Sequence, residues 1–264
     1  SSLSGYCSDA NSNSKFGTEA LCSLTSGTNS VAVGFRALKS NTTGRNSAFG
    51  NVALCTNTTG SFNTGLGDHA LFANTTGTLN TASGYASLYS NTTGTKNTAS
   101  GSYSLNDNTD GHRNTGLGYN ALAKNTEGDD NTASGYRSLY KNTTGCRNTA
   151  SGYESLGCNT TGCLNVATGY KTLFSNTTGD LNTAFGTRSL AVNTTGCRNT
   201  ASGAYALCLN TTGYYNTAVG YSALCGNTTG YQNTASGGFA LYSNTTGLRN
   251  SAVGYSALRG NTTG

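Results

Sequence analysis

A 17-residue phrase built around N-T-A-x-G-Y-x-A-L-x-x-N-T-T-G recurs along the chain from Gly17 to Gly264. A period this short holds one coil of a solenoid and is too short for the pair of helices in a helical repeat. Asn, Thr, Gly and Ser dominate the phrase, where a helix favours Ala, Glu and Lys. The chain contains no proline, which fits strands that are hydrogen-bonded on both sides. We therefore predict an all-β fold, a single-stack parallel β-solenoid (β-roll) of about fifteen 17-residue coils.

Two glycines per coil fix the register of the repeat. The first, here called the marker glycine, recurs from Gly17 to Gly254 every 17 residues, with one step of 16 between Gly34 and Gly50. The second, the corner glycine, lies ten positions later, where we expect a sharp turn with a positive φ. On this register residues 17–264 form the β-solenoid repeat array, and residues 1–16 form an irregular N-terminal segment.

Several columns follow from this register. Leucine stands four positions after every marker glycine, from Leu21 to Leu258, and an unbroken apolar column predicts the core. Asparagine stands four positions before it from Asn46 to Asn250, which predicts an amide ladder between stacked coils. Small residues two before it, such as Ala82 and Gly116, predict sheets that approach closely. An aromatic residue often follows the marker glycine, and we expect these rings to stack rather than to form a sugar-binding platform.

The position just before the marker glycine alternates irregularly between apolar residues and Ser or Thr. A fully buried column would not tolerate so much serine, so we expect this face to mediate self-association into a filament or homo-oligomer. A face half covered by its own loops is the alternative. The apolar members of the column are Phe16, Val33, Phe49, Leu66, Leu117, Phe185, Val219 and Val253.

One segment supports a family resemblance. Asn29–Gly34 reads NSVAVG, and repeated N-[ST]-A-x-G phrases with an Ala-Leu pair follow it through the array. This pattern resembles the YadA-like head repeats of trimeric autotransporter adhesins. The resemblance implies a left-handed parallel β-roll, association of three chains, and display on a bacterial surface for binding to extracellular matrix.

The NTTG phrase carries the main chemical signal. Each copy is an N-glycosylation acceptor, and Asn108 and Asn125 lose this sequon because an acid replaces the second threonine. Since the second threonine tolerates charge, we expect it to be exposed. We predict covalent N-linked glycans in a row along the corners; the threonine hydroxyls, or an unmodified repeat that multiplied by duplication, are the alternatives. The predicted sites are Asn41, Asn57, Asn74, Asn91, Asn142, Asn159, Asn176, Asn193, Asn210, Asn227, Asn244 and Asn261.

Nine cysteines in a small polar chain favour an oxidising compartment. Residues 17 apart lie one above the other in the predicted solenoid, so Cys146 with Cys163 and Cys208 with Cys225 fall within disulfide range. Cys7 with Cys22 is a further candidate pair, and Cys158 competes for Cys163. Cys55 and Cys197 have no stacked partner in this register.

Catalysis finds little support in the sequence. The two histidines, His69 and His112, stand in different columns, and the best polar coincidence is His112 stacked one coil below Asp129. The GGxGxD pattern of calcium-binding β-rolls is absent, so we expect no metal, no cofactor and no enzyme activity. The net charge of +5 is spread without a run of Lys or Arg, which argues against nucleic acid binding. No long apolar stretch predicts membrane insertion.

These features together predict an extracellular structural glycoprotein that forms a filament or surface fibre. Because the last repeat carries no polar cap, we also expect a segment of a longer or end-to-end stacked fibre. One alternative is an adhesin or viral fibre that binds a surface receptor. Another is an ice-binding solenoid that uses the Thr column from Thr81 to Thr149.

Overall fold

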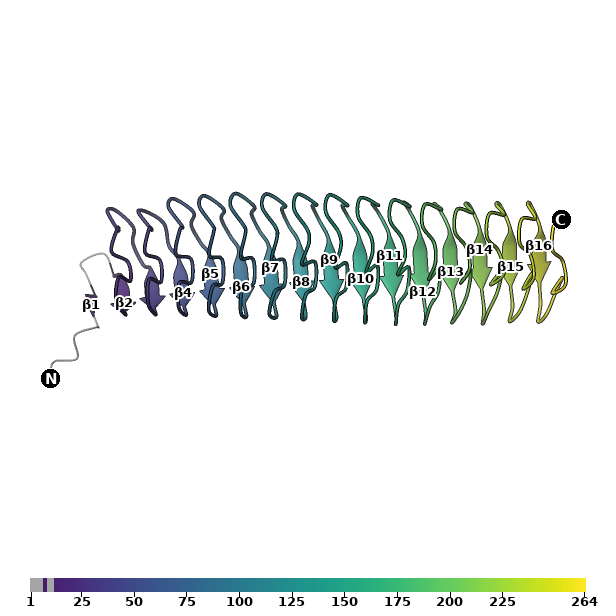
Figure 1. Ribbon diagram of the computed structural model, residues 1–264, viewed down its shortest axis with the longest axis horizontal. Coiled ribbons are helices and arrows are strands. Elements are labelled where there is room, and N and C mark those ends of the chain that lie inside the picture. The colour runs from purple at the N-terminus through teal and green to yellow at the C-terminus, as the bar shows by residue number, and fades with distance from the viewer. Residues whose placement is uncertain (1–6, 9–11) are drawn as a thin grey trace. The chain divides into compact units, whose positions relative to one another are not determined.

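The computed structural model describes residues 7–8 and 12–264 of a chain that divides into two compact units, Ser1–Asp130 and Asn131–Gly264. In the first unit β1 pairs antiparallel with β2, and β2 to β8 pair in parallel in sequence order (Figure 1). The strands of this unit are β1 (Cys7–Ser8), β2 (Ser14–Phe16), β3 (Val31–Val33), β4 (Ser47–Phe49), β5 (Thr64–Leu66), β6 (Thr81–Ser83), β7 (Thr98–Ser100) and β8 (Thr115–Leu117).

The second unit repeats the same arrangement, with each strand parallel to the next in sequence order. Its strands are β9 (Thr132–Ser134), β10 (Thr149–Ser151), β11 (Val166–Thr168), β12 (Thr183–Phe185), β13 (Thr200–Ser202), β14 (Thr217–Val219), β15 (Thr234–Ser236) and β16 (Ser251–Val253). Residues paired between parallel strands are 17 apart, except that those of β3 and β4 are 16 apart, as in Val31 with Ser47. The predicted parallel β-solenoid is therefore confirmed. Strand β2 begins at Ser14, so regular pairing starts inside the segment predicted to be irregular.

Each coil contains a single three-residue strand, so the expectation of facing sheets is wrong. On the wall opposite the strand, residues with a positive φ alternate with residues of ordinary φ. Lys171 (φ 50°) and Leu173 (φ 51°) are two of the residues with a positive φ. The amide of Lys171 donates to the preceding coil at Tyr153 O (2.9 Å), and that of Leu173 donates to the following coil at Ser189 O (3.0 Å). A left-handed non-glycine residue costs about 1–2 kcal/mol. Hydrogen bonds to both neighbouring coils offset that cost and hold the wall together without a second sheet.

The core contains one column of leucine and two columns of small residues, one at the middle of the strands and one three positions after the marker glycine, as at Ala70. The leucines from Leu38 to Leu241 are fully buried, as predicted, whereas Leu258 in the last coil is exposed. In most strands the middle residue is a buried alanine and its two neighbours point outward, as in Thr98–Ser100. The strand therefore presents a hydroxyl-rich outer face while its alanine packs beside leucine.

The two glycines are required for different reasons. Marker glycines have φ between 112° and 141°, a region that side chains disfavour. The expectation of a positive φ at the corner glycine is wrong for the corner glycines of the described coils except Gly44 and Gly264. Instead, a Cβ on Gly196 would overlap the side-chain oxygen of Asn193 and the carbonyl oxygen of Gly213. The corner needs glycine because two polar groups occupy the space of a side chain.

Candidate functional site at the NTTG corner

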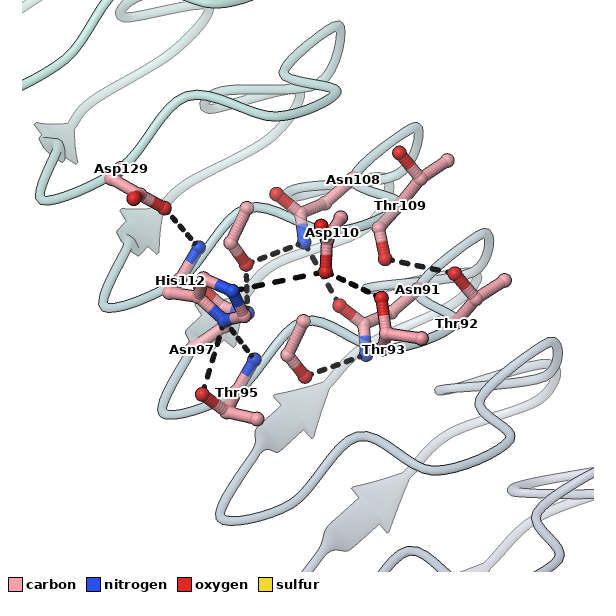
Figure 2. A network of polar contacts seen from close by, with 12 residues as sticks. Asn91, Thr92, Thr93, Thr95, Asn97, Asn108, Thr109, Asp110, His112 and Asp129 are labelled. Atoms are coloured by element: carbon pink, nitrogen blue, oxygen red, sulfur yellow. Dashed lines mark hydrogen bonds and ion pairs between the residues drawn. The ribbon is translucent and has the colours of Figure 1, made fainter.

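The first asparagine of NTTG, here called the corner asparagine, points into the coil. Asn193 Nδ2 donates to Asn176 Oδ1 (2.8 Å) in the preceding coil and to Gly196 O (2.9 Å) in its own. Asn193 Oδ1 in turn accepts from Asn210 Nδ2 (2.8 Å). Bonds between successive corner asparagines run from Asn41 to Asn125 in the first unit and from Asn142 to Asn261 in the second; Asn41 begins the ladder as an acceptor only, and its own Nδ2 has no hydrogen-bond partner among the described residues. The corner asparagines thus form a buried amide ladder; Figure 2 shows the bond from Asn108 to Asn91.

This ladder contradicts the predicted N-glycans. Glycosylation replaces one hydrogen of Nδ2, and in Asn193 both hydrogens are committed to oxygen acceptors. A sugar also needs an exit to solvent, and the side chain has none. Asn261 alone among the predicted sites is half-buried and donates one bond, to Asn244 Oδ1 (3.2 Å), so its glycan stays a prediction. The fully buried sites are Asn41, Asn57, Asn74, Asn91, Asn142, Asn159, Asn176, Asn193, Asn210, Asn227 and Asn244.

The two corner threonines differ in role. The first donates its hydroxyl to the next coil, as Thr75 Oγ1 does to Thr92 O (3.1 Å), and is half-buried. The second, such as Thr76 or Thr195, is exposed, which confirms the prediction drawn from its replacement by acids. The second hydroxyl is therefore the group of this corner that solvent reaches.

A second amide ladder uses the asparagine four residues before each marker glycine. Asn199 Oδ1 accepts the backbone amide of Asn216 (3.0 Å), and Asn199 Nδ2 donates to Gly213 O (2.8 Å). Gly213 O also accepts from Asn210 Nδ2 (3.0 Å), so the two ladders meet at the corner glycine. The predicted amide ladder is confirmed, and it runs beside one that the sequence did not reveal.

Stacking brings two of the predicted cysteine pairs together. Cys208 and Cys225 form a disulfide with a Cα–Cα distance of 4.9 Å. The sulfur atoms of Cys146 and Cys163 lie 2.8 Å apart, and the Cys146 amide donates to Cys163 Sγ (3.0 Å). The register of both pairs is as predicted; the covalent bond of the second pair stays a prediction.

The other cysteines lie apart. Cys22 is exposed, and the side chain of Cys7 lies outside the described residues, so their pairing stays a prediction. Cys158 and Cys197 are free and half-buried. Cys55 is buried, and desolvation raises the pKa of its thiol.

The predicted stacking of His112 and Asp129 is a backbone contact. The His112 amide donates to Asp129 Oδ1 (2.7 Å), while the imidazole Nδ1 accepts the Thr95 amide (3.0 Å), as Figure 2 shows. Asp110 lies 3.7 Å from His112 Nε2 and accepts the Thr93 hydroxyl. In this column a side chain of the next coil caps an amide that lacks a backbone acceptor, and this capping accounts for the polar cluster.

In residues 7–8 and 12–264 no three His, Cys, Asp or Glu side chains gather closely enough to hold a metal ion. None of the described segments forms a helix with the length and apolar character needed to span a membrane.

Aromatic rings stack along the surface of the second unit. Tyr136 and Tyr153 have ring centroids 5.0 Å apart with planes at 12°, and Tyr153 and Tyr170 follow at 5.3 Å and 16°. Other ring pairs differ in geometry: Tyr214 and Tyr231 are also stacked, at 5°, whereas Tyr103 and Tyr119 meet edge-to-face at 86°. The predicted stacking is confirmed for Tyr136, Tyr153 and Tyr170. Their faces cover one another, so they offer no open platform for a sugar.

The outer strand face combines hydroxyls with apolar side chains, which are adjacent in the row from Phe16 through Val33 and Phe49 to Leu66. Phe49 and Leu66 pair across β4 and β5 with 40% and 53% of their surface exposed. Phe185 on β12 is also exposed. The column before the marker glycine therefore faces solvent in the isolated chain, and its use in self-association stays a prediction.

The chain matches no protein-family model, no curated protein and no solved structure. Its function has to be inferred from its own residues.

Proposed function

We propose that this chain is a structural protein of an extracellular filament or surface fibre. The observation that carries the proposal is the pair of buried asparagine ladders, which join each coil to the next within both units. Buried, fully paired amides rigidify a structure, and an unpaired one is costly. Repeated axial bonding of this kind suits a load-bearing element.

Two surface features support the extracellular and self-associating parts of the proposal. The disulfide between Cys208 and Cys225 fits an oxidising compartment. The exposed pair Phe49 and Leu66 gives a second chain an apolar contact. If the fibre carries sugar, the exposed second threonine of each corner is the attachment point we propose, in place of the asparagine amide.

The proposal is tested by the assembly of purified full-length protein. We expect filaments by electron microscopy with an axial spacing of about 4.8 Å in fibre diffraction. The double variant Phe49→Ser and Leu66→Ser should weaken lateral association without changing the melting temperature, while Ser100→Ala on the same face should change neither. A chain that stays monomeric at every concentration, by analytical ultracentrifugation, would refute a filament role.

Glycopeptide mapping of native material tests the sugar separately. We expect unmodified asparagines at the NTTG corners and any sugar on the second threonine, such as Thr76. Sugar on Asn74 would contradict the buried ladder.

Ice binding is a second candidate because of one observation. Thr81 and Thr98 lie side by side on β6 and β7 and point outward, as do Ser83 and Ser100 beside them. A regular hydroxyl face of this kind is the feature that the ice-binding hypothesis requires. The chain should then inhibit ice recrystallisation and lose this activity in Thr98→Tyr; no inhibition by the parent chain rejects the candidate.

A further inference from the structure

A cavity of about 140 Å³ opens on the wall of the second unit, away from the corner and the strand face. It arises where a glycine stands in a column that has large side chains in the coils on either side. Tyr140, Gly157 and Phe174 occupy the same position, five residues after the marker glycine, in three successive coils. Gly157 is buried and leaves a slot between the two rings. Its lining includes Arg137, Tyr140, Lys141, Glu154, Gly157 and Phe174.

The shape of the slot suits a ring. A Cβ placed on Gly157 would lie 3.1 Å from the Cδ2 and Cε2 atoms of Phe174, so that ring closes one side of the slot. Tyr140 lines the slot from the coil on the other side of Gly157. Two aromatic side chains in the coils on either side of Gly157 favour a ligand with a ring-shaped, largely apolar body.

The charges around the slot favour an anion. The Arg137 guanidinium lies over the rings of Tyr136 (5.4 Å) and Tyr140 (5.2 Å), and its buried Nε has no hydrogen-bond partner among the described residues. Glu154, the acid at the slot, is already paired with Lys171 (3.2 Å). Lys141 at the slot is exposed and adds a further positive charge. Arg137 thus offers an unused charged donor, and the nearby carboxylate is neutralised elsewhere.

We propose that this slot binds a six-membered ring that carries a carboxylate. The ring lies between Tyr140 and Phe174, and the carboxylate accepts from Arg137, because a planar two-oxygen anion matches a guanidinium better than other acceptors do. Acidic sugars and aromatic acids share this chemistry. The site goes beyond the proposed fibre role, since binding at one coil does not depend on assembly.

Isothermal titration of the full chain with sodium benzoate and sodium glucuronate tests the proposal. We expect a Kd of about 1 mM for at least one of them, as suits so small a ligand. Arg137→Gln should weaken binding about tenfold or more, because a charge-assisted hydrogen bond is lost. Gly157→Phe should abolish binding by filling the slot with a side chain that the same position accepts at Phe174. Arg188→Gln, an exposed arginine two residues after its own marker glycine, is the matched control.

Neutral analogues and thermal melting complete the test. Glucose and benzamide should bind at least tenfold more weakly than the acids, and each variant should melt near the parent temperature. Binding of benzoate alone identifies an aromatic acid, and binding of glucuronate alone identifies an acidic sugar. The proposal is overturned if neither acid binds the parent chain, if neutral analogues bind equally well, or if a folded Arg137→Gln or Gly157→Phe variant binds as the parent does.

Discussion

Replacing one corner asparagine by alanine should open its coil selectively. Asn193→Ala removes two donated hydrogen bonds and one accepted bond. Gly196 O keeps a partner, because it also accepts from Asn182 Nδ2 (2.8 Å). Asn176 Oδ1 loses the hydrogen bond that Asn193 donates to it, and one hydrogen of Asn210 Nδ2 loses its acceptor, Asn193 Oδ1. At about 1–3 kcal/mol for each orphaned buried group, the expected loss is about 2–6 kcal/mol.

Hydrogen exchange followed by mass spectrometry measures this loss, because coils of a solenoid open individually rather than in one global transition. Protection should fall in the coil of Asn193 and in its immediate neighbours. Thr195→Ala is the matched control in the same corner, and since Thr195 is exposed it should change protection by less than about 0.5 kcal/mol. Equal effects of the two substitutions would refute the claim that the buried ladder stabilises the stack.

Three further outcomes are expected. Leu139→Asp buries an unpaired charge and should abolish the protection of its coil from hydrogen exchange. Thr144→Asp, which copies the natural acid at Asp110, should leave that protection in place. Equal melting of the two variants contradicts the assigned core. Mild oxidation should link Cys146 to Cys163 in a non-reducing digest, and recovery of both as free thiols under oxidant rejects that pairing. Hydrogen bonds from Lys39 and Arg36 lower the pKa of Glu19, so this pairing stabilises the fold at neutral pH, and the contribution is lost as pH falls through the lowered pKa. Glu19→Gln should therefore flatten the acid side of the curve of unfolding free energy against pH. An unchanged curve rejects the pairing.

Periodicity was sufficient to predict the coil, the leucine core and one amide ladder. It could not predict which way a corner side chain points, because a repeat fixes spacing and leaves inward and outward undecided. A signal was nevertheless present: Asn108 and Asn125 persist where the sequon is broken, so asparagine is needed there for its own sake. Glycosylation was the wrong reason for a residue that the fold requires.

The left-handed leucines were beyond sequence reasoning for a different cause. Intrinsic preference disfavours φ near 50° at a residue such as Leu173, and only its bond to the next coil explains it. The slot beside Gly157 was equally hidden, since it depends on which positions of successive coils share one column. Contacts 17 residues apart decide both features.

The corner ladder gives a stack of coils a direction along its axis. From Asn57 to Asn125 and from Asn159 to Asn261 each amide donates toward the lower-numbered coil, so the side-chain dipoles align and their sum grows with the number of asparagines. A stack of such coils is polar along its axis, with amide hydrogens facing one end and amide oxygens facing the other. Two stacks that met with like ends would set oxygen against oxygen. End-to-end contact between such stacks is therefore favoured head to tail, and an assembly built in this way would be polar along its axis.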